Sequence, residues 1–272
     1  MLDFKNVREE FLNIASNNDV DNSDVDWIFC YTLNKDRSNL KLVKEISDLE
    51  YKFAKKILNK RIKGFPIDQI IHESNFYGLK FYVNKNVLIP RPETELLVEQ
   101  IIKNVKKSSN GLDIGTGSGV IAISLNKLAN MNMCACDISN KALSVAKKNN
   151  KILSTSVKFL KSDLYLKVNG KFDFIVSNPP YIKSEDINSL QREVKDHEPR
   201  LALDGKEDGL YFYRKIIEDA PKHLKKDGMI FFELGEGQSN DVKAMLEENF
   251  KDIVIVKDYS KIDRIIYAVK RW

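Results

Sequence analysis

Histidine and cysteine are scarce in this sequence. The three histidines, His72, His197 and His223, are scattered along the chain. Two of the three cysteines, Cys134 and Cys136, stand close together, but no second Cys or His pair follows at zinc spacing. We therefore expect no metal site and no catalytic histidine. We interpret both cysteines as buried free thiols that point to the same side of a strand.

Long apolar runs are also absent. No stretch approaches the length of a membrane span, and the first residues, "MLDFKNVREEF", carry charge too early for a signal peptide. We expect a cytoplasmic protein with no membrane partner. Apolar residues make up 43% of the chain and charged residues 31%, which is enough to build a core. The net charge of +5 is compatible with an anionic partner such as nucleic acid, but it does not by itself indicate one.

Glycine is missing from the first part of the chain, where none precedes Gly64. Helical spacing of apolar residues there predicts a small helical bundle. The third predicted helix, within "LVKEISDLEYKFAKKILNKRI", places five apolar residues on one face: Leu42, Ile46, Leu49, Phe53 and Ile57. The region holds no convergent cluster of acids, histidines or cysteines. We therefore expect it to recognise or support something rather than to perform chemistry.

The pattern changes after this region. Residues 74–90 alternate as in a β-hairpin, and from residue 93 short apolar runs alternate with helical segments. Such alternation predicts an α/β fold with a doubly wound, mostly parallel sheet of seven strands covered on both faces. The last two strands follow each other directly, so the final one should run antiparallel at or near an edge. The predicted domains are 1–73 (helical), 74–92 (hairpin and linker) and 93–272 (sheet).

A glycine-rich turn follows the first strand of that sheet. In "LDIGTGSGVIAISL" (112–125) the glycines Gly115, Gly117 and Gly119 enclose Thr116 and Ser118. Glycine allows a sharp turn and a close approach to a ligand, and the next helix presents its backbone N–H groups. The spacing differs from the common dinucleotide and phosphate-loop patterns, and no lysine follows. The turn alone is weak evidence, since glycine also serves packing.

Three further strand ends carry candidate groups. Asp137 stands where an acid accepts from ribose hydroxyls in open α/β sheets, although it could also cap the helix near Asn140. Asp163 could accept from an amino group and Leu164 could cover a flat base, or Asp163 could be an ordinary turn acid. The fourth strand ends at Asn178. Four consecutive strand ends with such groups favour a ligand site.

The fourth strand ends in "SNPPY". Pro179 and Pro180 stiffen the chain, Asn178 offers an amide and Tyr181 a flat aromatic face. By themselves these four residues could simply stop a strand and start a turn. Their place beside the other strand ends favours a functional interpretation.

In this order, "LDIGTGSG", "CDIS" and "SNPPY" resemble the class I S-adenosylmethionine-dependent methyltransferases. The segments "VLIPRPETELLVEQ" (87–100) and "HEPRLALDGKEDGL" (197–210) resemble the HemK/PrmC family of release factor (protein-glutamine) methyltransferases more specifically. The family usually has a Gln-Tyr-Ile-x-Gly-like element ahead of the hairpin, where this chain has "DQIIHES" (68–74).

The resemblance implies transfer of a methyl group from S-adenosylmethionine to the side-chain amide nitrogen of a glutamine in peptide chain release factors. The other product is S-adenosylhomocysteine, with no metal and no need for nucleic acid. The helical residues 1–73 would recognise the partner. The implied cofactor-binding residues are Gly115, Thr116, Gly117, Ser118, Gly119, Asp137, Asp163, Leu164 and Asn178. The implied catalytic and substrate-binding residues are Asn178, Pro179, Pro180 and Tyr181, with Arg91 and Glu93 bordering the pocket.

This chemistry suits the residues. An amide nitrogen is a poor nucleophile, so both its N–H groups must be held while the nitrogen faces the methyl group. The Asn178 side chain and the Pro179 carbonyl can accept from them, and Tyr181 can lie against the amide plane. Arg91 and Glu93 could instead belong to a helix start capped near Thr94, and Glu198 to an ordinary salt-bridged loop.

Two other functions fit parts of the pattern. A DNA methyltransferase acting on adenine shares "NPPY", because an exocyclic amine presents the same two N–H groups, but it needs a large base-recognition region. The extra region here is small and its charges are mixed. A catalytically inactive adaptor is the third hypothesis, and the intact Gly115, Asp137 and Asn178 argue against it.

Overall fold

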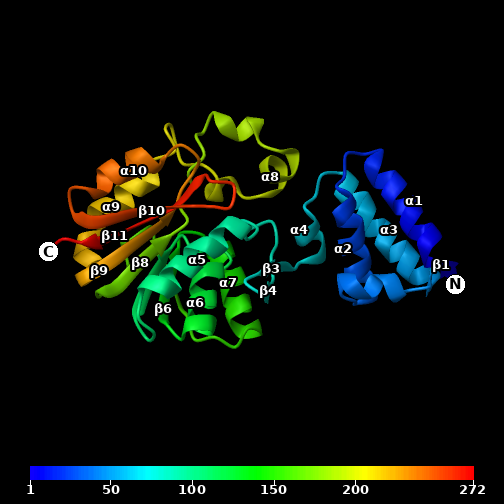
Figure 1. Cartoon of the computed structure of the whole chain (residues 1–272), viewed down its shortest axis with the longest axis horizontal. Coiled ribbons are helices and arrows are strands. Elements are labelled where there is room, and N and C mark those ends of the chain that lie inside the picture. The colour runs from blue at the N-terminus through cyan, green and yellow to red at the C-terminus, as the bar shows by residue number, and fades with distance from the viewer. The chain divides into compact units, whose positions relative to one another are not determined.

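A computed structural model describes all 272 residues of the chain, and it divides into two units (Figure 1). The first unit contains residues 1–73 together with 191–197. The second contains residues 74–190 and 198–272. The short segment 191–197 thus belongs with the N-terminal helices, although it lies within the sequence of the second unit. No helix in either unit has the length and apolarity needed to cross a membrane.

The first unit is a bundle of helices around its own core. Short polar residues start two of the helices, because Asp3 and Asp21 accept backbone N–H groups of the first turn. In the core, the ring of Phe29 packs against the rings of Phe4 and Phe11. The elements are β1 (Leu2–Asp3), α1 (Phe4–Ser16), α2 (Asn22–Leu33), a 3₁₀ turn (Arg37–Leu42), β2 (Glu45–Ile46), α3 (Asp48–Ile62), α4 (Ile67–Ile71) and α8 (Arg192–His197).

Helix α3 is shorter than the sequence pattern predicts. It begins at Asp48, because Ser47 and Glu50 form a capping box that satisfies the free N–H groups of its first turn. The predicted apolar face was wrong for four of its five residues. Leu42 lies in the 3₁₀ turn and is exposed, Ile46 lies on β2, Leu49 and Phe53 are exposed on α3, and Ile57 alone is buried on the helix, with Ala54 and Leu58.

The second unit is built on a sheet of seven strands in the order β10-β11-β9-β8-β5-β6-β7. The pairs from β9 to β7 are parallel, and β11 runs antiparallel to both of its neighbours. This confirms the predicted fold class and the antiparallel final strand near an edge. The strands are β5 (Asn110–Ile114), β6 (Asn132–Asp137), β7 (Lys158–Lys161), β8 (Phe172–Ser177), β9 (Leu224–Glu233), β10 (Phe250–Lys257) and β11 (Asp263–Lys270).

Helices cover both faces of this sheet (Figure 1). Alternation along β8 explains the two layers, because Ile175 packs with α9 and α10 whereas Phe174 and Val176 pack with α5 and α6. The free thiols of Cys134 and Cys136 both lie in the layer of Ile175, as their spacing predicts, but Cys136 is buried whereas Cys134 is only half-buried. The helices are α5 (Pro92–Asn104), α6 (Val120–Ala129), α7 (Asn140–Ile152), α9 (Tyr211–His223) and α10 (Ser239–Leu246).

A hairpin precedes the sheet. Strands β3 (Ser74–Phe76) and β4 (Leu79–Phe81) pair antiparallel across a tight turn. Tyr77 and Gly78 both have positive φ angles, as this kind of two-residue turn requires. Phe76 and Phe81 bury their rings in the layer of α5 and α6. The hairpin therefore leads the chain from residue 74 onto one face of the sheet.

The strand order places the candidate groups together. The chain runs outward from β5 through β6 to β7, then returns to β8 on the other side of β5. Ligands of open α/β sheets bind at such a reversal, outside the carboxyl ends of the strands. The ends of β5, β6, β7, β8 and β9 all lie at this edge.

Candidate active site

A cavity of about 350 Å³ opens at the carboxyl ends of the parallel strands. Its lining includes the predicted residues Arg91, Gly115, Thr116, Gly117, Ser118, Asp137, Asp163, Leu164, Asn178, Pro179 and Pro180. Three other predicted residues, Glu93, Gly119 and Tyr181, do not line it. The volume falls in the range of small-molecule sites, about 300–1,000 Å³. The structure therefore brings most of the predicted groups to one hollow.

The glycines of the turn after β5 have two different roles. All three have positive φ angles, which side chains rarely adopt. A Cβ atom on Gly115 or Gly117 would meet no atom within 4 Å, so their backbone borders open space in the cavity. A Cβ atom on Gly119 would lie 2.8 Å from Ile123 Cδ1. Gly119, with a φ angle of +83° and Ala146 Cβ 3.1 Å from that position, thus allows α6 and α7 to pack closely, whereas Gly115 and Gly117 form a cradle that a ligand could fill.

Asp113, near the end of β5, is hydrogen-bonded to this glycine turn. Its Oδ2 accepts a hydrogen bond from Thr116 Oγ1 at 2.6 Å, and its Oδ1 is buried without a hydrogen-bond partner. Burial raises the pKa of Asp113 to about 7. The sequence analysis missed this residue. It stands inside the apolar strand that leads into the glycine turn, where an acid has no ordinary structural purpose.

Asp137, at the end of β6, is also hydrogen-bonded to the glycine turn. Its Oδ2 accepts the Gly117 N–H at 2.9 Å and its Oδ1 accepts the Ser139 N–H at 2.8 Å. The possibility that Asp137 caps α7 is wrong, because Ser139 is the cap and accepts the Ala142 N–H. Burial raises the pKa of Asp137. Each carboxylate oxygen has a second lone pair, so Asp137 can still accept from a ligand in the cavity.

The segment after β7 carries a strained residue. Leu164 has a φ angle of +43°, which is unusual for a branched side chain. The Cys136 thiol donates to the Leu164 carbonyl at 3.6 Å. Asp163 is exposed at the cavity rim. Backbone strain of this kind often marks a binding site, and here it places Asp163 and Leu164 side by side at the cavity.

The Asn-Pro-Pro-Tyr segment leaves β8 at the centre of the edge. Asn178 is half-buried, and its Nδ2 donates to Thr94 Oγ1 at 3.3 Å. Tyr181 is anchored away from the cavity, because its carbonyl accepts a hydrogen bond from Gln238 Nε2 at 3.0 Å and its ring lies close to Gly235. Burial raises the pKa of Tyr181 to about 12. The two prolines therefore connect an amide at the cavity to a fixed aromatic residue.

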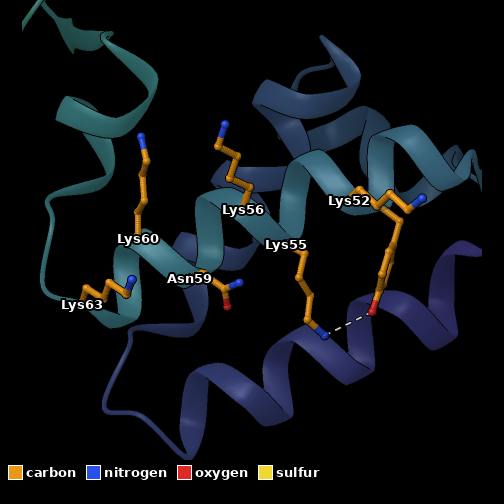
Figure 2. Close-up of a pocket in the computed structure, with 7 residues that line it drawn as sticks. Lys52, Lys55, Lys56, Asn59, Lys60 and Lys63 are labelled. Carbon is orange, nitrogen blue, oxygen red and sulfur yellow. Dashed lines mark hydrogen bonds between the residues drawn. The ribbon is translucent and has the colours of Figure 1, made fainter.

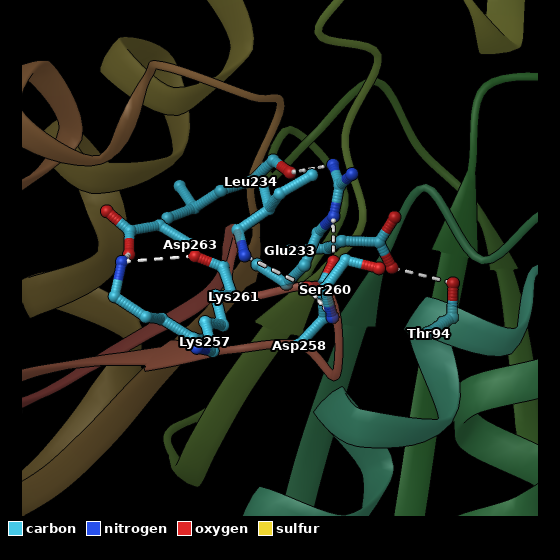
Figure 3. A network of polar contacts seen from close by, with 10 residues as sticks. Thr94, Glu233, Leu234, Lys257, Asp258, Ser260, Lys261 and Asp263 are labelled. Carbon is cyan, nitrogen blue, oxygen red and sulfur yellow. Dashed lines mark hydrogen bonds and ion pairs between the residues drawn. The ribbon is translucent and has the colours of Figure 1, made fainter.

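Thr94 is not a helix cap. Helix α5 begins after Arg91 without a side-chain cap, and the Thr94 hydroxyl donates to Glu233 Oε2 at 2.6 Å (Figure 3). Glu233 ends β9 and, like Thr94, is 2% exposed. The sequence analysis overlooked this fifth strand end, although "GMIFFEL" gave the same signal as the others, an apolar run that ends on a polar residue.

Arg91 and Glu198 form an ion pair at the rim of the cavity. Arg91 Nη2 lies 2.5 Å from Glu198 Oε1, and the Glu198 side chain is 1% exposed. The pair joins the residue before α5 to the loop that follows α8, so the salt-bridged loop is present and it borders the cavity. Glu93 lies in the first turn of α5 and is exposed.

A different hollow, of about 440 Å³, lies in the first unit along α3 (Figure 2). It is lined by Tyr51, Lys52, Lys55, Lys56, Asn59, Lys60 and Lys63. Lys55 donates to Glu10 Oε1 and to the Tyr51 hydroxyl, and the Glu10 bond raises the pKa of Lys55. Lys52, Lys56 and Lys60 are exposed. The hollow has no acid–base pair for catalysis, but it presents concentrated positive charge.

No group of three or more His, Cys, Asp or Glu side chains in the chain is arranged to hold a metal ion.

Comparison with known proteins shows what the chain resembles. Residues 92–207 match the methyltransferase small domain family. The chain is 39% identical over 256 residues to a release factor glutamine methyltransferase of Bacillus cereus, covering 89% of this chain and 90% of that protein. Among solved structures, a methyltransferase from Pyrococcus furiosus superposes with a TM-score of 0.56 at 20% identity, covering 72% of this chain and 90% of that one. A T. thermophilus 16S rRNA methyltransferase in complex with AdoMet and guanosine superposes with a TM-score of 0.54 at 17% identity, covering 73% and 50%.

Proposed function

Because the chain belongs to the release factor glutamine methyltransferase family, we propose that it transfers a methyl group from S-adenosylmethionine to the side-chain amide nitrogen of the glutamine in the Gly-Gly-Gln motif of peptide chain release factors. The observation that carries the proposal is the position of Asn178. Its amide lies at the same cavity as the cradle of Gly115 and Gly117, so one hollow offers both a cofactor place and an amide-binding group.

S-adenosylmethionine fits the residues at this cavity. The backbone at Gly115 and Gly117 leaves open space where side chains would stand, which admits the close approach of a ligand. Asp137 has acceptor capacity for ribose hydroxyls, Asp163 for the adenine amino group, and Leu164 offers an apolar side chain to the base. When bound, this cofactor supplies an electrophilic methyl group on a sulfonium, and S-adenosylhomocysteine remains after transfer. The proposal requires no metal.

Asn178 and Pro179 hold the substrate amide. The Asn178 Oδ1 and the Pro179 carbonyl accept its two N–H groups, so that the nitrogen lone pair faces the methyl carbon. Methylation would replace one N–H of the amide, and the proton of that N–H would leave to water. Positioning of this kind supplies an effective molarity on the order of 10⁵ M, about 7 kcal/mol of the barrier. Tyr181 fixes the Pro-Pro segment through its half-buried ring and its bond to Gln238.

Recognition of a whole release factor needs contacts remote from the reaction, because a glutamine side chain offers little binding energy by itself. We propose that the first unit supplies them. The exposed lysines of α3, Lys52, Lys56 and Lys60, favour an acidic surface of the partner. The ion pair of Arg91 and Glu198 would hold the loop at the cavity rim while the glutamine enters.

Mass spectrometry of release factor incubated with this protein and isotope-labelled S-adenosylmethionine tests the function. We expect one labelled methyl group on the glutamine of the Gly-Gly-Gln motif, and little label on a short Gly-Gly-Gln peptide that lacks the remote contacts. The same assay with double-stranded DNA is the comparison arm. Label in DNA but not in release factor would overturn the proposal in favour of adenine methylation.

A further inference from the structure

A chain of two hydrogen bonds connects the candidate catalytic amide to a buried acid. Asn178 Nδ2 donates to Thr94 Oγ1 at 3.3 Å. Thr94 Oγ1 in turn donates to Glu233 Oε2 at 2.6 Å (Figure 3). The three residues come from the end of β8, the first turn of α5 and the end of β9. Strands β8 and β9 are parallel neighbours with Ser177 beside Phe232, so Asn178 and Glu233 are the next residues along.

The chemistry of Glu233 fixes the direction of this chain. An ionised carboxylate only accepts hydrogen bonds. The Thr94 hydroxyl has one proton, and it must therefore give that proton to Glu233 and accept from the next group. The next group must donate, so Asn178 turns its NH₂ toward Thr94. The Asn178 carbonyl oxygen is then directed away from Thr94, where it can accept an N–H of the substrate.

Glu233 has no ion-pair partner of its own. The carboxylate is buried, and the hydrogen bond to its Oε2 comes from a neutral group, the Thr94 hydroxyl. An unpaired buried acid is costly to a fold, and replacement by an apolar or amide side chain would ordinarily be tolerated or favourable. The presence of a carboxylate at this position therefore indicates that Glu233 has a role in the neighbouring site.

We propose that Glu233 is a positioning residue, which through Thr94 orients the Asn178 side-chain amide so that its oxygen faces the substrate. The inference rests on the proposed function and deepens it by assigning a role to two residues outside the Asn-Pro-Pro-Tyr segment. Glu233 does not touch the reacting atoms in this scheme. Its effect is exerted on the rotation of one amide, which must be correct before the substrate nitrogen can be held.

Protonation of Glu233 should remove the orientation. A neutral carboxylic acid can donate to Thr94, which frees the Thr94 hydroxyl to donate to Asn178 Oδ1 and turn the amide over. The charged and titratable groups around Glu233 are Glu93 on α5, Arg264 on β11, Tyr181 after β8 and Tyr213 on α9, whose hydroxyl donates to the Glu233 carbonyl. Burial, the largest influence, raises the pKa of Glu233 to about 7. The carboxylate form, and with it turnover, should decline as the pH falls through that value.

The first experiment compares Glu233→Gln with the wild type, using release factor as substrate. Glutamine keeps the size of the side chain but can either donate to or accept from Thr94, so the direction is no longer imposed. We expect kcat to fall by on the order of 10²-fold, the scale of a mispositioned group, while cofactor affinity measured by calorimetry stays within a few-fold. The acidic limb of the kcat–pH profile, centred near the pKa of Glu233 of about 7, should be lost.

A second pair of variants keeps the inference testable if Glu233→Gln does not fold. Thr94→Val removes the hydroxyl with little change of shape and should lower kcat to a similar extent, whereas Thr94→Ser retains the hydroxyl and should restore most of it. Asp263→Asn is the matched control, because Asp263 pairs with Lys257 in the same region but has no link to Asn178 (Figure 3). It should leave kcat and the acidic limb unchanged.

Two outcomes would overturn the inference while leaving the proposed function intact. One is a Glu233→Gln enzyme with wild-type kcat and an unchanged acidic limb. The other is equal activity of the Thr94→Val and Thr94→Ser enzymes. A wild-type enzyme that transfers no methyl group to release factor would instead overturn the proposed function itself, and the two failures are therefore distinguishable.

Discussion

Two groups of buried acids, one in the first unit and one at the strand ends of the second unit, are held in opposite ways. In the first unit, Asp26 accepts from Arg8 and Arg37, and Asp24 pairs with Arg61 at 2.6 Å. In the second unit, three buried acids at or near strand ends have no cation within ion-pair distance, namely Asp113, Asp137 and Glu233. Hydroxyl and backbone N–H groups hold them instead. An acid paired with arginine stabilises its bundle, whereas an acid left without a cation keeps acceptor capacity and a raised pKa for a site.

The largest effect is expected from a substitution at the candidate active site of the second unit. Asn178→Ala removes the amide that holds the substrate nitrogen, and kcat on release factor should fall by on the order of 10³-fold. Calorimetry should find cofactor affinity within a few-fold of wild type, because the loss concerns positioning. Asn240→Ala, an exposed asparagine on α10, is the control and should be fully active. Full activity of the Asn178 variant would show that the Asn-Pro-Pro-Tyr segment merely ends the strand and has no role in catalysis.

Asp137→Ala should weaken binding of S-adenosylmethionine by about 1–3 kcal/mol, the scale of hydrogen bonds to a charged group. Two causes act together, because the variant loses an acceptor for the ligand and also the bond that holds the Gly117 N–H. Titration calorimetry measures the change. Affinity equal to that of wild type would remove Asp137 from the cofactor site.

Substitution of the exposed lysines of α3 tests whether the first unit recognises the release factor. Replacing Lys52, Lys56 and Lys60 together by glutamate should raise the KM for whole release factor by about tenfold, with cofactor affinity unchanged. Added salt should narrow the difference between this variant and wild type, because exposed charges are screened. The control replaces three exposed lysines of the second unit, Lys215, Lys222 and Lys243, in the same way. Equal effects of the two triple variants would show that net charge, rather than this face, matters.

The smallest effect concerns stability, and here the two kinds of acid should respond with opposite signs. Asp26→Asn removes a partner of two arginines and should lower the free energy of unfolding by about 1–3 kcal/mol. Glu233→Gln should raise it at pH 8. The folded-state pKa of Glu233 is raised from 4.5 to about 7, so the wild-type fold loses stability as the pH rises between these values.

Urea unfolding at pH 4 and at pH 8 measures both variants. The advantage of Glu233→Gln should be small at pH 4, where the acid is protonated in both folded and unfolded states, and should grow by up to about 3 kcal/mol at pH 8. A Glu233→Gln protein that is less stable than wild type at pH 8 would show that the carboxylate contributes to the fold, and the contrast between the two units would be lost.

The sequence predicted the sheet well and the bundle less well, for a physical reason. Strand–helix alternation repeats over the whole second unit, so single errors at element ends did not change the fold class, which the structure confirms. In the first unit the position of the third predicted helix depended on one apolar periodicity. That periodicity failed at Leu49 and Phe53, because the local capping box at Ser47 sets where α3 begins and the bundle buries a different face. The family assignment from the motifs is also confirmed.

What the sequence alone determined were the groups contributed by single positions: the glycine turn, the acid after β6 and the amide at Asn178. These are local, because a strand end and the residue that follows it are adjacent in the chain. The relation of Asn178 to Thr94 and Glu233 depended on the tertiary structure, since these residues stand 84 and 139 positions apart along their hydrogen-bonded links. Only the pairing of β8 with β9 and the packing of α5 bring the three together, and no spacing in the sequence records that contact.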